Sequence, residues 1–397
     1  MIAFPKLTEQ ELLDRIRIPS EGKLNIFLDT DTYNEIDDQF AILYAMLSPE
    51  RLCLKGISAA LFFNDRSASP ADGMEKSYRE ILKIMDFLGK DPEGFVFRGC
   101  TEPLADEEVP RESLACDAII AEAMKASETD PLYVVGIGAC TNIASAILKA
   151  PEIIRRITVV WLGGNTFDWP DNKEFNLSQD SLAGKVLFDC GVPMIQIPAF
   201  GVTGFLLTSV PELEACLSGA NPVCDYLVEN VKSYSQDHFA WSKPIWDVGA
   251  IGYLINPDWA ESKACPAPII AQKDRYAFDP RRHLIRSLIT IDRDKVFKDM
   301  FQKASGLPQI KKADCCKGPG WPQQQSAFFL LSILISCFIF APCITYSLLP
   351  LAFLLGSDMQ LPKTAHCSSL IWISTPLTST PPSARIRIYF APLMILV

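Results

Sequence analysis

The sequence predicts an α/β fold whose core is one mostly parallel sheet. From about residue 24 to residue 300, short apolar runs alternate with amphipathic stretches of helical length. Neighbouring parallel strands need a long crossover connection, which is usually a helix, so this alternation is typical of repeated βαβ units. We therefore expect a Rossmann-like α/β domain with helices on both faces of the sheet.

The individual elements follow from hydrophobic periodicity. The predicted strands are the apolar runs at 25–28, 51–60, 93–97, 132–136, 157–162 and 192–197. The predicted helices carry apolar residues at helical spacing and lie at 74–88, 113–126, 142–149 and 181–189. A further helix over 40–47 is too apolar to be exposed, so we expect it to be packed inside the domain.

The chain of 397 residues is long enough for one large α/β domain or two ordinary ones. We assign residues 1–21 to an N-terminal extension, 22–305 to a single α/β domain and 306–397 to an apolar C-terminal tail. The tail has no charged residue between Lys317 and Asp358. Its segment 327–356 is long enough to span a membrane but holds two prolines. A membrane anchor, a hydrophobic extension and an imperfect gene model all remain open for it.

Composition limits the partners. The net charge is -10 and the pI is about 5.0, which argues against nucleic acid or an anionic membrane surface as the main partner. The 13 cysteines are scattered and show no zinc-site spacing, which favours free thiols in a reducing compartment. Charged residues interrupt the N-terminus too often for a secretory signal. We therefore expect a cytoplasmic protein.

Four carboxylates crowd the end of the first predicted strand. The stretch Leu28–Ala41 reads LDTDTYNEIDDQFA and contains Asp29, Asp31, Asp37 and Asp38. Carboxylates this close repel one another unless a cation or shared protons compensate. A helix N-cap would account for one of the four. Because ligands of parallel α/β sheets bind at the carboxyl ends of the strands, the stretch predicts a cation site there.

Two families share features of this stretch. Asp29-Thr30-Asp31-Thr32 resembles the nucleophile motif of the haloacid-dehalogenase-like phosphatases, in which Asp29 would attack phosphorus and Asp31 would act as acid and base. That family also needs a second acidic pair at a late strand end, and the sequence shows none. The whole string from Asp29 to Asp38 resembles the DxDxxxDD motif of the inosine-uridine-preferring nucleoside hydrolases, with two additional residues, Asn34-Glu35, in the loop.

Further motifs, in order along the chain, strengthen the second resemblance. They are Gly138-Ala139-Cys140-Thr141-Asn142-Ile143-Ala144, Leu162-Gly163-Gly164-Asn165, Lys173-Glu174-Phe175-Asn176, Ile245-Trp246-Asp247-Val248 and Ile291-Asp292-Arg293. The resemblance covers roughly residues 22–303. It implies a nucleoside hydrolase-like fold and a Ca²⁺-dependent enzyme that hydrolyses the N-glycosidic bond of ribonucleosides to ribose and free base. It also implies a homo-oligomer.

The resemblance assigns roles to residues of this chain. The metal ligands would be Asp31, Asp38, Asp247 and the carbonyl of Thr141, with the ribose hydroxyls completing the oxygen shell that Ca²⁺ prefers. Asp37 would be the general base. The expected substrate contacts are Asn64, Asn165, Glu174, Asn176 and Trp246.

The leaving base raises a separate question, because many family members have a histidine where this chain has Trp246. His238 lies close enough in sequence to serve as the general acid instead, or the base departs without an enzyme acid. Three simpler roles also stay open: a surface position for His238, a turn position for Asn165 and a helix cap for Thr141. A non-catalytic protein that binds metal and ribose is the remaining alternative to an enzyme.

Overall fold

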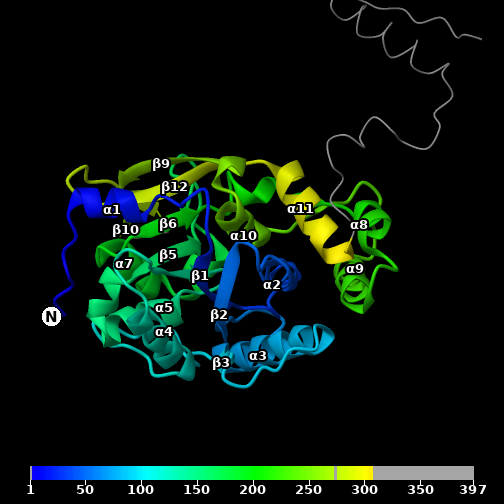
Figure 1. The fold of residues 1–397 in the computed structure, drawn as a ribbon, viewed down its shortest axis with the longest axis horizontal. Helices are drawn as coiled ribbons and strands as arrows, with labels where there is room; N and C mark the ends of the chain where they lie inside the picture. Colours follow the sequence, from blue (N-terminus) through cyan, green and yellow to red (C-terminus); the bar gives the residue numbers. More distant parts are fainter. Residues whose placement is uncertain (1, 272–274, 307–397) are drawn as a thin grey trace, which may run out of the picture. The chain divides into compact units, whose positions relative to one another are not determined.

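The computed structural model describes residues 2–271 and 275–306, which form a sheet with helices on both faces (Figure 1). The main sheet has eight strands in the order β3-β2-β1-β4-β5-β6-β12-β9. Its strands are β1 (Leu24–Thr30), β2 (Leu52–Ala59), β3 (Val96–Arg98), β4 (Leu132–Gly136), β5 (Ile157–Leu162), β6 (Met194–Ile197), β9 (Ala260–Pro266) and β12 (Leu284–Ile291). All neighbours pair in parallel except β9, which runs antiparallel to β12. The predicted mostly parallel α/β fold is therefore confirmed.

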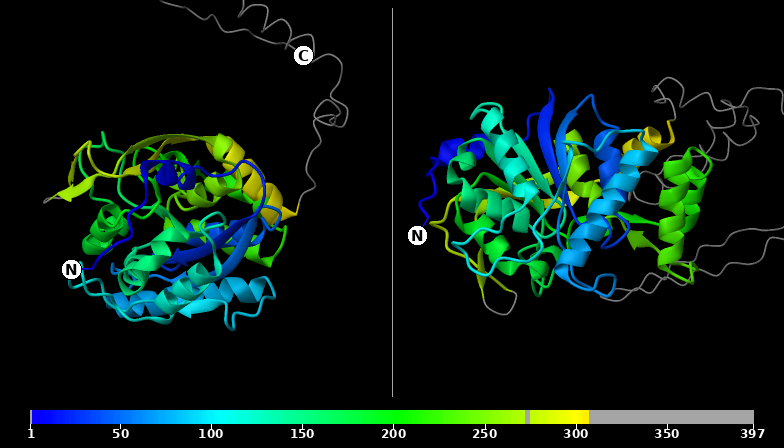
Figure 2. Two further views of the ribbon diagram at one scale, coloured as in Figure 1. Left: turned by 60° about the vertical axis from the view of Figure 1, so that its left-hand side comes forward. Right: turned by 90° about the horizontal axis from the view of Figure 1, so that it is seen from below.

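The strands lie between two groups of helices, as the turned views also show (Figure 2). One group contains α4 (Leu114–Lys125), α5 (Thr141–Lys149) and α7 (Ser181–Asp189). The other contains α2 (Asp38–Met46), α3 (Pro70–Phe87), α10 (Val248–Ile255) and α11 (Arg293–Ser305). Because both faces are covered, the central strands are apolar throughout, and every residue of β4 and β5 is buried.

Smaller elements complete the described chain. The helices are α1 (Glu9–Arg15), α6 (Phe175–Gln179), α8 (Val210–Leu217) and α9 (Pro222–Tyr234), with short 3₁₀ turns at Pro151–Arg155, Thr203–Phe205 and Pro257–Trp259. Two small antiparallel pairs join β7 (Leu207–Thr208) to β8 (Lys243–Pro244) and β10 (Ile269–Ala271) to β11 (Arg275–Ala277).

The segment predicted as an N-terminal extension packs against the domain. A capping box between Thr8 and Glu11 starts α1. Arg15 donates to the carbonyl oxygens of Arg155 and Ile157, at 2.9 and 2.6 Å, and Ile16 is fully buried. This segment therefore contributes to the core of the same domain.

The sequence placed most elements within a few residues. The strands 132–136 and 157–162 and the helix 181–189 have the predicted bounds. Helix α3 begins earlier than predicted, because Ser69 caps it through the amide of Asp72 and Pro70 occupies its first position. The predicted strand 93–97 is instead Val96–Arg98. The periodicity did not indicate that β9 runs antiparallel at the sheet edge.

The apolar tail, including the candidate span 327–356, lies outside the described residues. Within residues 2–271 and 275–306, no helix combines the length and apolarity that crossing a membrane requires.

Candidate functional site

The acidic loop lies where the strand order of the sheet reverses. Strand β1 sits between β2 and β4, so the connections from β1 and β4 leave in opposite directions and open a crevice at their carboxyl ends. The chain leaves β1 at Thr30 and enters α2 at Asp38, which places Asp31 and Asp37 in the connecting loop. Asp247 approaches the same place from the start of α10, where it is the N-cap residue.

Three carboxylates from distant parts of the sequence meet in this crevice. One carboxylate oxygen from each of Asp37, Asp38 and Asp247 lies within 4.8 Å of the other two. All three residues are buried, with at most 4% of their surface exposed. Oxygen ligands at this spacing fit a hard divalent cation such as Ca²⁺. Of the three carboxylates predicted to converge, Asp31, Asp38 and Asp247, this cluster contains Asp38 and Asp247, and its third member is Asp37, the predicted general base.

The electrostatics of the cluster call for a positive charge. Burial, followed by the carboxylates of Asp37 and Asp38, raises the pKa of Asp247 well above its ordinary value. Burial and then Asp38 do the same to the pKa of Asp31. The pKa of Asp37 rises to about 6 through burial and the nearby Glu35 carboxylate. A divalent cation would relieve this mutual repulsion.

Neighbouring groups hold the acidic loop in place. The Thr30 hydroxyl donates to Asp38 Oδ1 at 2.5 Å and lies 3.0 Å from the hydroxyl of Thr32. Asp31 packs against Gly138, where an added Cβ would lie 3.0 Å from the Asp31 carboxyl carbon, so a larger residue would push Asp31 aside. Asp31 Oδ2 is buried and has no hydrogen-bond partner among the described residues, so it is available to a ligand.

A cavity of about 140 Å³ opens over these carboxylates. It is lined by Asp31, Asn34, Glu35, Asp37, Asp38, Ile137, Leu162, Glu174, Phe175, Asn176, Ala199, Phe200, Trp246 and Asp247. We call it the acidic cavity. Of the predicted substrate contacts, it brings together Glu174, Asn176 and Trp246.

Glu174 and Asn176 face the cavity from the start of α6. Glu174 caps this helix by accepting from the amides of Asn176 and Leu177, both at 2.9 Å, and it also accepts from the amide of Gly164 at 2.8 Å. Burial raises the pKa of Glu174, while these amide contacts oppose the rise. The Asn176 side chain donates to the carbonyl of Leu162 at 2.9 Å. Both side chains are therefore held rigidly.

Aromatic rings also line the acidic cavity. Trp246 meets Phe200 edge to face, with ring centroids 5.2 Å apart. Phe200 in turn stacks on Trp169 at 5.4 Å. Trp246 thus occupies a packed position beside Asp247 and presents no titratable group to the cavity.

Other predicted site residues lie elsewhere. Asn64 lies outside the acidic cavity and donates to the side chain of Asn34 at 2.6 Å. Asn165 is fully buried, and its side chain serves the loop, donating to the Asp171 carbonyl and accepting from the Phe200 amide. The ring of His238 lies 3.0 Å from the Lys232 carbonyl and is not among the residues that line the acidic cavity.

Thr141 also does not line the acidic cavity. Its hydroxyl donates to Asp180 at 2.7 Å, and the N-cap of α5 is Cys140. The residue of this turn that does line the cavity is Ile137, directly after the last residue of β4. The position of Ile137 at a strand end beside the aspartate loop could have indicated a site residue, but an apolar side chain does not suggest metal or substrate binding.

Two charged residues near the cavity were also missed. Lys243 is 7% exposed and forms an ion pair with Glu35, which lines the cavity. Burial works against the charged lysine, but the carboxylates of Asp37 and Glu35 raise the pKa of Lys243. The only sequence signal for Glu35 was that it belongs to the two additional loop residues.

Asp29 faces away from the acidic cavity. Its Oδ1 accepts from the Ser58 hydroxyl at 2.5 Å and from the Asn142 amide at 2.8 Å. Burial raises the pKa of Asp29 to about 7. A phosphatase nucleophile must reach its substrate, whereas this carboxylate is 1% exposed and ties β1 to β2 and α5.

Comparisons with known proteins agree with this geometry. Residues 26–298 match the family model described as inosine-uridine preferring nucleoside hydrolase. The pyrimidine-specific ribonucleoside hydrolase RihA of Escherichia coli is 27% identical over 264 residues, which cover 59% of this chain and 80% of RihA. A solved plant nucleoside hydrolase has a TM-score of 0.59 at 18% identity, covering 72% of this chain and all of its own. The purine-preferring ribonucleoside hydrolase of Gardnerella vaginalis has a TM-score of 0.57 at 24% identity, covering 71% and 98% of the two chains.

Proposed function

Because this chain belongs to the inosine-uridine preferring nucleoside hydrolases, and is thus an N-glycosyl hydrolase, we propose that its acidic cavity splits ribonucleosides into ribose and free base with Ca²⁺ as cofactor. The observation that carries the proposal is the meeting of Asp37, Asp38 and Asp247 in one buried cluster. The neighbouring Glu174 and Asn176 supply polar groups for a sugar in the same cavity.

Asp38 and Asp247 are the proposed carboxylate ligands, joined by Asp31 through its unpartnered oxygen. We propose the main-chain carbonyl of Ile137 as a further ligand in place of Thr141, because Ile137 lines the acidic cavity and Thr141 does not. Bound there, Ca²⁺ would seat the ribose diol and lower the pKa of an attacking water.

Asp37 is the proposed general base, which accepts a proton from the attacking water at a carboxylate oxygen. Its place inside the three-carboxylate cluster also allows the opposite assignment, in which Asp37 binds the ion and Asp31 takes the proton. Asparagine variants of the two residues separate these roles. Loss of Ca²⁺ affinity marks the ligand, and loss of turnover with Ca²⁺ still bound marks the base.

The remaining side chains stabilise the reacting sugar. Cleavage of a glycosidic bond passes through an oxocarbenium-like transition state, whose positive charge the surrounding carboxylates favour. Glu174 and Asn176 are proposed to hold ribose hydroxyls, and their tethered positions reduce the ordering needed on binding. Since Trp246 cannot donate a catalytic proton and His238 lies outside the cavity, we propose that the base departs without a histidine acid.

The test is a panel of purine and pyrimidine nucleosides incubated with the full chain. Free base is detected by chromatography, with added Ca²⁺ and with chelator. Release that stops with chelator and in Asp37→Asn supports the proposal. Calcium-dependent binding of a ribose analogue without release from any nucleoside would instead identify a non-catalytic binder.

A further inference from the structure

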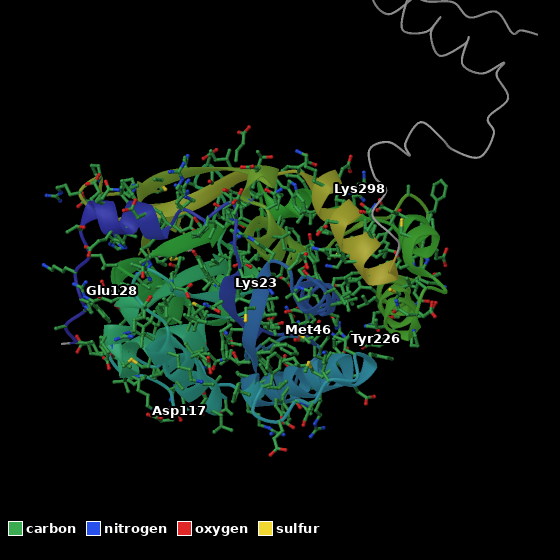
Figure 3. All side chains as sticks on the ribbon, in the orientation of Figure 1. Lys23, Met46, Asp117, Glu128, Tyr226 and Lys298 are labelled. Carbon is green, nitrogen blue, oxygen red and sulfur yellow. The ribbon has the colours of Figure 1, made fainter. Side chains whose placement is uncertain are left out.

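A second cavity adjoins the acidic cavity and shares Asn34 and Glu35 with it. Its volume is about 630 Å³, compared with about 140 Å³ for the acidic cavity. It lies among α2, α3 and α9, and Figure 3 labels Tyr226, one of its lining residues, on α9. We call it the distal cavity. One ligand could extend from the acidic cavity into it along the shared residues.

Gln39 lines the distal cavity and carries a buried acceptor. Gln39 is 2% exposed, and its Oε1 has no hydrogen-bond partner among the described residues. Its Nε2 donates to Glu80 Oε1 at 3.4 Å. Rotating the amide by about 180° would place its oxygen against the Glu80 carboxylate, where two acceptors repel each other. The amide orientation is therefore fixed, and Oε1 is the atom without a donor. A buried acceptor without a donor is costly and calls for an explanation.

Glu80 adds a negative charge beside this acceptor. It is 6% exposed, and no ion pair joins it to a lysine or arginine within the described chain. Tyr226 and Gln39 both donate to its Oε1, which leaves Oε2 without a donor from the described residues. A buried carboxylate that lacks a cationic partner favours a ligand that brings positive charge.

The cations of the cavity wall are engaged with aromatic rings. Lys83 lies over the Tyr226 ring at 3.8 Å, and Arg66 lies over the Tyr33 ring at 4.7 Å. These contacts hold both charges on ring faces. Lys83 and Arg66 line this cavity as its cations, while Gln39 and Glu80 are its buried acceptors.

We propose that the distal cavity binds an amine-bearing substituent of the substrate, with Gln39 Oε1 and Glu80 as acceptors. This inference rests on the proposed function, because the ribose of the same ligand would occupy the acidic cavity. The preferred substrate class would be ribonucleosides with an extension that ends in a protonated amine. Such a group supplies three N–H donors and the positive charge that Glu80 lacks.

Binding is measured by calorimetry on the full chain with Ca²⁺, using two matched pairs of adenosine derivatives. One pair carries 6-aminohexyl or hexyl at N6, and the other carries the same groups at C5′. In at least one pair, the amine is expected to bind about tenfold or more tightly than its alkyl partner. Gln39→Met and Glu80→Gln should each remove most of that gain. Asp86→Asn, an exposed change on α3, should leave it intact.

Melting temperatures of all variants show whether a lost gain reflects unfolding. Amines that bind no better than their alkyl partners in both pairs overturn the inference, as does a gain that survives both substitutions. These outcomes are distinct from failure of the proposed function. In that case adenosine, inosine and uridine would neither bind nor release free base.

Discussion

Asp38 at the start of α2 and Asp247 at the start of α10 bring carboxylate oxygens within 4.8 Å of each other inside the protein. Both helices begin at the carboxyl-end side of the sheet, where their N-termini add positive partial charge near the two carboxylates. This relationship joins the acidic loop to a turn near the end of the domain.

Removing one proposed metal ligand should weaken metal binding and slow catalysis. We expect Asp247→Asn to lower kcat/KM by about 10³-fold or more, because the cation that organises sugar and water is no longer held. Calorimetry with Ca²⁺ and a nucleoside assay measure the two effects. The exposed change Asp258→Asn is the control. Full turnover in Asp247→Asn would rule out the proposed metal site.

The metal-free protein should lose stability as pH rises. The folded-state pKa of Asp37 is about 6, above its ordinary 3.8, so the folded state binds the proton more tightly than the unfolded state. Its contribution is present below pH 4 and is lost as pH rises through 6, amounting to about 3 kcal/mol. Melting curves in chelator between pH 4 and pH 7 test this sign. Ca²⁺ should flatten the dependence by stabilising the ionised carboxylates.

Asp29→Asn separates the two families considered from the sequence. Asp29 faces Ser58 and Asn142 and not the acidic cavity, so kcat per folded molecule should stay within about tenfold of wild type. A phosphatase that uses Asp29 as its nucleophile would instead lose all of its activity in Asp29→Asn. Base release and phosphate release measured side by side give the answer.

Trp246→His should supply the missing proton donor. A histidine beside Asp247 would line the acidic cavity, and general acid catalysis contributes about 10²-fold or more when correctly placed. We expect faster release of poor leaving bases and a new decline in kcat above the histidine pKa. Trp246→Phe controls for lost packing against Phe200. Equal rates in the two variants would contradict the expectation.

Lys243 should keep Asp37 ionised. Burial and Glu35 raise the pKa of Asp37, and the Lys243 charge opposes them. Lys243→Met should therefore raise the pKa of Asp37 further and move the acidic limb of the kcat/KM profile to higher pH. Lys243→Arg keeps the charge and should restore most of the wild-type profile. An unchanged limb in Lys243→Met would show that the ion pair with Glu35 has no influence on the base.

The sequence predicted much of the fold, because buried parallel strands and their crossover helices leave strong patterns. Strands 132–136 and 157–162 could be assigned to the residue. The nucleoside hydrolase family was also recognised from short motifs, and the family match confirms it. The antiparallel edge strand β9 left no such pattern, because none of its seven residues is buried and its sequence has no continuous apolar run.

Side-chain roles were harder to predict, because they depend on which way a residue faces. Ile137 could act only through its backbone, which no residue type reveals. Lys243 gains its place from a partner more than 200 positions away, the Glu35 carboxylate. The expectations of Ca²⁺ as the ion, a homo-oligomer and a cytoplasmic location stay predictions.

The order of the ligands along the chain has a consequence for synthesis. Asp31, Asp37 and Asp38 leave the ribosome early, whereas Asp247 follows only after all the strands from β1 to β6 have been made. A nascent chain can thus build most of its parallel sheet while the cluster of Asp37, Asp38 and Asp247 is still incomplete. On the proposed role of Asp247 as a metal ligand, shortened products that stop before α10 would hold no complete metal site and would be inert toward nucleosides.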